Sequence, residues 1–232
     1  MARIKFGMMM TDARGKLGGH VFTKARSGAT VRTKVTPVNP KSVAQGAVRS
    51  RFASLSQSWS SLSEAQRLAW NALALATGKT NIFGDKYFPS GKNLFVAVNS
   101  NILLAGGTII NDAPSNITMP AITAFDGAIE LDLGNFALLT EVAGAIPANT
   151  TAVYLASPPS SPGIYNFSGK HYVFYTTSAD SDPVPTAVFG AYVEKFGSLE
   201  LGKKISVQVF FINKITGQST QRSSIQLLVS NS

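Results

Sequence analysis

Few side chains of this 232-residue chain could carry out acid–base or nucleophilic chemistry. There is no cysteine, which excludes a thiol nucleophile, a disulfide and a thiolate metal site. Glu130 and Asp132 lie on one side of a predicted strand, as a paired general acid and base would. Asp180 and Asp182 share a predicted turn. At a sheet edge or in a turn such pairs are ordinary surface charge, and we favour that interpretation for both.

Metal and phosphate chemistry has no complete motif in the sequence. His20 and His171 have no second ligand at metal-binding spacing. Gly78-Lys79-Thr80 matches the end of a phosphate-binding loop, but the required earlier glycine is Leu73 and a predicted helix precedes it. The sequence therefore predicts no catalytic residue, no cofactor and no metal, and we expect a protein that is not an enzyme.

Basic side chains, in contrast, are strongly clustered. The formal net charge is +9, yet residues 1–51 contain eleven Lys and Arg against Asp12 alone, so the remainder is nearly neutral. Such a block favours a polyanion or an acidic protein surface as partner, and a solvated basic tail is the alternative. The predicted partner-binding residues are Arg14, Lys16, Lys24, Arg26, Arg32, Lys34, Arg49 and Arg51.

Residues 1–40 are predicted to form an extended basic arm that contains a β-hairpin. Ser27-Gly28 is the expected turn, with strands over 21–26 and 29–35. This register places Lys24 opposite Val31 and leaves neither face of the hairpin cleanly apolar. The hairpin is therefore expected to need a partner.

Residues 41–108 are predicted to form a three-helix unit. The first helix is expected to start at Asn39-Pro40 and to run to about Ser60. Its apolar residues recur at helical spacing: Val43, Ala47, Val48, Phe52, Leu55 and Trp59. Because Trp70 lies on the second helix, the corner between the two has two tryptophans to bury.

Local signals set the ends of the other two helices. Ser63 and Gln66 form a capping box at the start of the second, and Gly78 is expected to end it in a left-handed C-cap. The third helix is expected to begin at Ser90 and to end at Gly106-Gly107.

Residues 109–120 are predicted to be a linker, and residues 121–232 an antiparallel β-sandwich resembling immunoglobulin or fibronectin type III modules. The expected strands are short apolar runs between turns, over 128–133, 151–156, 172–176, 187–195, 204–212 and 223–229. Gly217 is expected to turn the last hairpin, and the proline-rich stretch 157–163 to be an exposed tip. The predicted fold class is thus α+β multidomain.

The order of these parts resembles uncharacterised virion structural proteins of tailed bacteriophages and their prophages. The resemblance covers nearly the whole chain and is most specific in the helical stretch, at Asn39, Pro40, Gln45, Arg49, Phe52, Trp59, Leu62, Gln66, Arg67, Trp70 and Asn71. It implies a structural subunit of the virion but says little about its place in the particle; we expect a capsid-associated or head–tail component, made in the bacterial host cytoplasm. Copies of the chain and other virion proteins are then the expected partners.

Two other functions stay open on the sequence. The basic arm could contact the phosphates of packaged DNA without sequence specificity. The β-domain could bind carbohydrate through its tyrosines, which are Tyr154, Tyr165, Tyr172 and Tyr175, although core packing explains most of them. No membrane partner is expected, because no apolar stretch is both long and uninterrupted enough to span a bilayer.

Overall fold

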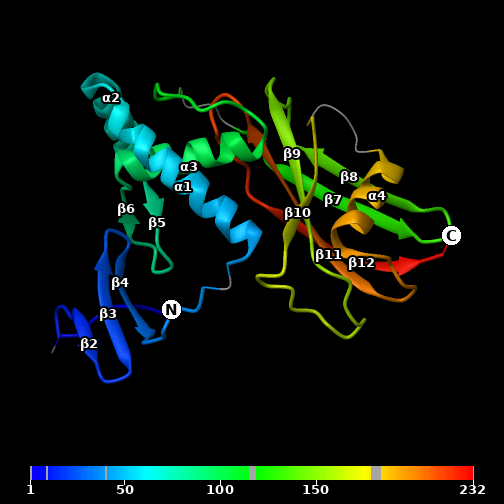
Figure 1. Cartoon of the computed structure of the whole chain (residues 1–232), viewed down its shortest axis with the longest axis horizontal. Helices are drawn as coiled ribbons and strands as arrows, with labels where there is room; N and C mark the ends of the chain where they lie inside the picture. Colours follow the sequence, from blue (N-terminus) through cyan, green and yellow to red (C-terminus); the bar gives the residue numbers. More distant parts are fainter. Residues whose placement is uncertain (1, 9, 40, 115–118, 179–183, 232) are drawn as a thin grey trace. The chain divides into compact units, whose positions relative to one another are not determined.

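The structure, a computed structural model, describes residues 2–8, 10–39, 41–114, 119–178 and 184–231. Its elements are four helices and several sheets, an α+β arrangement (Figure 1). The chain forms two compact units. The first contains residues 1–97 and 111–113, and the second contains residues 98–110 and 114–232.

The basic segment folds into a four-stranded sheet in the order β1-β4-β3-β2, shown in blue in Figure 1. Its strands are β1 (Ala2–Ile4), β2 (Gly15–Leu17), β3 (His20–Ala25) and β4 (Gly28–Thr33). The predicted β3–β4 hairpin is present, but Ala25 pairs with Gly28, so the turn is Arg26-Ser27 rather than Ser27-Gly28. Lys24 consequently faces Ala29, and the apolar pair Phe22–Val31 forms directly across the strands.

The helical part of the first unit is a corner built on Phe95. It comprises α1 (Val43–Ser61), α2 (Glu64–Ala76) and the first half of α3 (Gly91–Leu104). Trp59 lies 5.6 Å and Trp70 5.3 Å from the ring centre of Phe95. Trp70 is fully buried, and Trp59 is largely buried with a smaller part of its surface exposed. The prediction that both tryptophans are mostly buried is thus confirmed.

The starts of these helices follow their caps. The capping box of α2 is present as predicted, and the hydroxyl of Ser90 caps α3 by accepting a hydrogen bond from the Asn93 amide. The predicted start of α1 was wrong. Ser42 is its N-cap, since Lys41 has a φ of 50°, which a right-handed helix cannot continue.

The end of α2 also differs from the prediction. Gly78 does not adopt the left-handed conformation, and α2 ends with Thr77 as C-cap. Gly78 has a packing reason instead, because a Cβ there would meet the Phe88 ring at 3.1 Å. The first unit is completed by the short pair β5 (Lys79–Thr80) and β6 (Lys86–Tyr87).

The second unit is a six-stranded curled sheet in the order β10-β9-β11-β12-β7-β8. Its strands are β7 (Ile122–Glu130), β8 (Asn135–Val142), β9 (Thr150–Ala156), β10 (Tyr172–Ser178), β11 (Lys204–Asn213) and β12 (Ser223–Ser230). β12 and β7 are parallel, and the other neighbours are antiparallel. The described strands form one sheet rather than two facing ones, so the predicted sandwich is not confirmed.

Helix α4 (Pro185–Phe196) covers the open side of the curled sheet, beside the edge strands β8 and β10 (Figure 1). Phe136 of β8, Phe174 of β10 and Tyr192 of α4 pack with ring centres about 6 Å apart, which closes the core. The prediction of a strand over 187–195 was wrong. Val188, Tyr192 and Phe196 recur every four residues, which is a helical period.

The other face of β9 and β11 is also buried. The second half of α3 belongs to this unit, and Ala105 just after it packs with Val153, Leu155, Phe210 and Ile212. Asn99 exchanges two hydrogen bonds with the backbone of Ile110, and the Asn101 amide donates to Gly217 O at 3.0 Å. The asparagines of α3 therefore tie loops to the helix. Gly217 turns the last hairpin as predicted, with a φ of 64°.

Candidate assembly surface of the first unit

The sheet sorts the predicted basic residues onto different faces. Val21 pairs with both Lys16 of β2 and Arg32 of β4, so the three side chains form one row across the sheet. Lys34 follows Arg32 by two residues, and its amide donates to Gly19 O at 2.7 Å, which continues the ladder. The alternation of strands places Lys34 on the face of Arg32. We call Lys16, Arg32 and Lys34 the basic face; all three are exposed.

Lys24 lies on the opposite face and is paired. Its ammonium is 3.1 Å from Asp12, and Arg14 lies 3.5 Å from the same carboxylate. The hydrogen bond from Lys24 lowers the pKa of Asp12 from its usual 3.8, aided by the charges of Lys24 and Arg14. Of the predicted residues, Lys24 and Arg14 therefore serve the sheet itself, whereas the basic face has no carboxylate among its described contacts.

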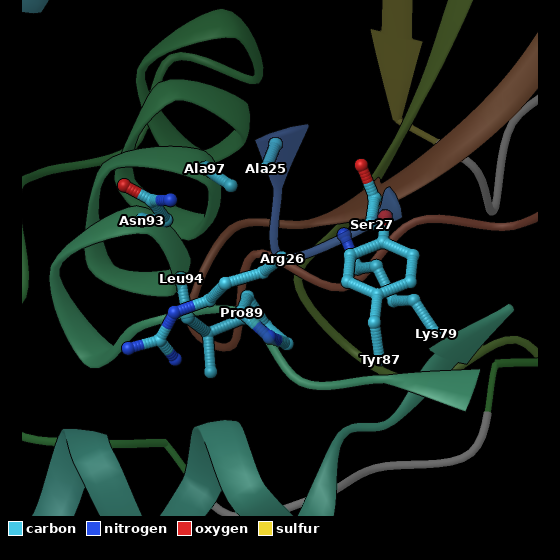
Figure 2. Close-up of a pocket in the computed structure, with 9 residues that line it drawn as sticks. All are labelled: Ala25, Arg26, Ser27, Lys79, Tyr87, Pro89, Asn93, Leu94 and Ala97. Carbon is cyan, nitrogen blue, oxygen red and sulfur yellow. The ribbon is translucent and has the colours of Figure 1, made fainter. Parts of the chain in front are cut away.

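Arg26 is separated from both groups, because it stands in the β3–β4 turn beside a hollow of about 400 Å³ (Figure 2). It extends toward Pro89 and Leu94, and its guanidinium donates to Phe88 O at 3.4 Å. Lys79 and Tyr87, directly opposite in the β5–β6 pair, line the same hollow. Two cations beside apolar walls suit a carboxylate on an apolar group. Lys79 stood out in the sequence only as part of the incomplete phosphate-loop match, and Tyr87 was not predicted to line a site.

Polar contacts hold the basic sheet to the β5–β6 region. Lys5 pairs with Asp85 at 3.0 Å, and the Asn81 side chain donates to Ser27 O at 3.2 Å. Hydrogen bonds from Lys5 and Asn81 lower the pKa of Asp85 from its usual 3.8. Both members of the ion pair are more than half exposed, so the contact is weak.

Arg49 and Arg51, the remaining predicted residues, lie on α1. No hydrogen bond or ion pair joins them to the basic sheet within the described part of the chain. Val43, Val48 and Phe52 on this helix are 90%, 62% and 60% exposed. The periodic stripe predicted for α1 is thus buried only from Leu55 onward. Nothing in the sequence separates the exposed part of this stripe from the buried part.

The residues considered for chemistry remain scattered in the structure. Glu130 accepts a hydrogen bond from Asn135 at 3.1 Å, and His20 is exposed on β3. Asp180 and Asp182 lie outside the described residues. Where the chain is described, no three acidic or histidine side chains gather as a metal would require. Of the four tyrosines, Tyr154 is buried while Tyr165 and Tyr172 are exposed.

Comparisons of the chain with known protein families, with curated proteins and with solved structures found no match. Among the described helices, none is long and apolar enough to span a membrane.

Proposed function

We propose that this protein is a non-enzymatic structural subunit of a tailed-phage virion that assembles with copies of itself through the basic face. The observation that carries the proposal is the single sign of this face, on which Lys16, Arg32 and Lys34 lie exposed. Three exposed cations on one sheet face attract an acidic partner. Their fixed spacing also determines which arrangement of carboxylates can pair with them.

A second copy offers a matching surface. The first unit carries fifteen Lys and Arg against four Asp and Glu, whereas the second carries six against eight. On the β7–β8 hairpin, Asp126 faces Leu139, Ala124 faces Glu141, and Glu130 faces Asn135. Strand alternation places Asp126, Glu130 and Glu141 on the face opposite the core residue Ile129. We call these three carboxylates the acidic face.

The proposed contact joins the basic face of one copy to the acidic face of the next. Such a head-to-tail contact uses two different surfaces, so it repeats from copy to copy and builds closed rings or open helical filaments. Leu139, 54% exposed among the carboxylates, would be covered in it. The exposed stripe of α1 supports the same proposal, since burying Val43, Val48 and Phe52 adds roughly 1.5–3 kcal/mol for each side chain fully covered.

In a particle, the second unit would serve as a rigid β-rich body that the first unit attaches to its neighbours. The finer prediction, an immunoglobulin-like or fibronectin-like module, stays a prediction. Its support is a β-rich core between a helix and a curled sheet. Capsid and head–tail junction are both compatible with a repeating head-to-tail contact.

A reciprocal charge swap tests the contact. One variant combines Lys16→Glu with Arg32→Glu, and the other combines Asp126→Lys with Glu141→Lys. Each alone places like charges against each other and should stay monomeric in sedimentation velocity, under conditions in which the unmodified chain associates. An equimolar mixture restores opposite charges at every contact and should associate again. Lys195→Glu, at an exposed position of α4 outside both faces, is the control. Association of either variant alone would refute the contact.

Nucleic-acid binding is a second candidate, favoured by the same basic face. Three or four phosphate contacts predict that the logarithm of the DNA association constant falls with the logarithm of salt concentration at a slope of about −3. Titration with duplex DNA at two salt concentrations separates the candidates. Binding lost near physiological salt favours assembly, whereas tight binding retained there, with the charge-swapped mixture still monomeric, favours DNA.

A further inference from the structure

A polar hollow of about 430 Å³ lies on the second unit, on the same face of the curled sheet as the acidic face, since Ser230 of β12 pairs with Glu130 of β7. Its floor is four side chains on neighbouring strands. Ser206 and Gln208 of β11 stand directly opposite Gln226 and Ser224 of β12. Hydroxyl and amide groups thus alternate at the corners of a rectangle of about 5 by 7 Å, set by the strand spacing and the two-residue repeat.

This floor is not the continuation of a uniformly wet sheet face. Alternation along β11 puts Ser206 and Gln208 on the same face as Phe210 and Ile212, which are buried with Val153 and Leu155. The face therefore changes from apolar and buried at Phe210 to polar and partly exposed at Gln208, two residues away. Ser206, although polar, is only 4% exposed.

The wall of the hollow is a loop held by specific contacts. Phe167 anchors it with 4% of its surface exposed, and the Gln226 amide donates to Tyr165 O at 3.1 Å. His171 Nε2 lies 2.9 Å from the hydroxyl of Ser206. Burial, and then the charge of Arg222, lower the pKa of His171, which keeps the imidazole neutral at neutral pH. The hollow is consequently formed before any ligand enters.

Among the described residues that line the hollow, Arg222 is the single full charge and none is a carboxylate. Its guanidinium carbon lies 5.0 Å from the centre of the Phe210 ring, which restricts the orientation of its plane. A planar guanidinium recognises a carboxylate in a bidentate manner. Amides and hydroxyls, each able to donate and accept, suit the neighbouring hydroxyls of a sugar.

We propose that this hollow binds an acidic saccharide, with the sugar hydroxyls on the Ser206, Gln208, Ser224 and Gln226 floor and the carboxylate on Arg222. A free phosphate is the lesser fit, because one cation and four uncharged side chains supply too little positive charge for a dianion. The proposal uses other residues than the assembly contact, since none of the described residues that line the hollow belongs to the basic or the acidic face, although its β12 side lies on the sheet face that carries Glu130.

Titration calorimetry of the full chain with three probes tests the proposal. A hyaluronan tetrasaccharide, which carries glucuronate, should bind. Chitotetraose, its neutral counterpart, should bind at least about tenfold more weakly, as a lost charge-assisted hydrogen bond predicts. Inorganic phosphate should give no measurable heat. Absence of tetrasaccharide binding, or phosphate binding as tight as the tetrasaccharide, would overturn the proposal.

Variants locate the binding. Arg222→Gln should weaken the tetrasaccharide about tenfold and leave chitotetraose unchanged, whereas Gln208→Ala should weaken both. Lys195→Gln removes one charge at an exposed position of α4 and should change neither affinity. Circular dichroism of each variant checks that the fold is kept. Equal affinity of the Arg222→Gln variant and the unmodified chain would place the saccharide elsewhere and refute the assignment.

Discussion

Trp70 and Trp59 pack on the same ring, yet the structure predicts that their loss has different costs. Trp70 is fully buried, meets Phe95 edge-on at 5.3 Å, and donates from its indole nitrogen to Asn111 O at 2.7 Å. Trp70→Ala should therefore destabilise the protein by about 3–5 kcal/mol, the cost of a large cavity in a core. Trp59 keeps part of its surface exposed, so Trp59→Ala removes less buried area and should cost less.

A conservative variant separates packing from hydrogen bonding. Trp70→Phe keeps an aromatic ring against Phe95 but removes the donor to Asn111, and should cost about 1–2 kcal/mol. Urea unfolding followed by circular dichroism at the helical band measures all three variants without relying on the deleted fluorophore. The emission of the remaining tryptophan should be blue-shifted in Trp59→Phe and red-shifted in Trp70→Phe. Equal destabilisation by the two alanine variants would refute the proposed packing.

Three further predictions concern caps, turns and pH. Ser63→Ala removes the N-cap of the capping box and should cost about 1 kcal/mol in urea unfolding, while Ser61→Ala, two residues before it, should cost less. Gly217→Ala should lower the thermal midpoint more than Gly163→Ala, because its φ is 64° and its new Cβ would lie 2.6 Å from Val98 O. The lowered pKa values of Asp12 and Asp85 stabilise the fold above about pH 4, and this contribution is lost as the pH falls through the folded-state values. The protection of the amides in β1 and β3, measured against their slower intrinsic exchange in acid, should then fall on acidification, and less so in Lys5→Ala.

Local signals in the sequence predicted the elements whose stabilisation is local. The capping box at Ser63 and Gln66 and the turn at Gly217 depend on residues a few positions apart, and both are present. The start of α1 was missed by three residues because Lys41 adopts a positive φ that its residue type does not signal. Helix α4 could have been predicted from the four-residue spacing of Val188, Tyr192 and Phe196. A short apolar run is, however, compatible with either a strand or a helix.

The arrangement of strands was beyond local inference. Whether six short strands form one curled sheet or two facing sheets depends on which edges pair, and β12 joins β7 through only two paired positions, Val229–Ile129 and Ser230–Glu130. The basic residues show the same limit. Strand alternation alone puts Arg32 and Lys34 on one face, but the neighbours of that face depend on β2, whose pairing brings Lys16 into the row.

The two candidate surfaces follow from this difference between composition and pairing. Eleven basic residues in the first 51 would act as a diffuse charge if the segment were extended. Folding into a sheet divides them into two groups. Lys24 and Arg14 form ion pairs with Asp12, whereas Lys16, Arg32 and Lys34 lie together on the other face, where they can contact a partner. A fixed row of cations selects a partner whose carboxylates have strand spacing, which a flexible basic tail could not do. The acidic face of β7 and β8 has that spacing, and the charge swap tests this correspondence directly.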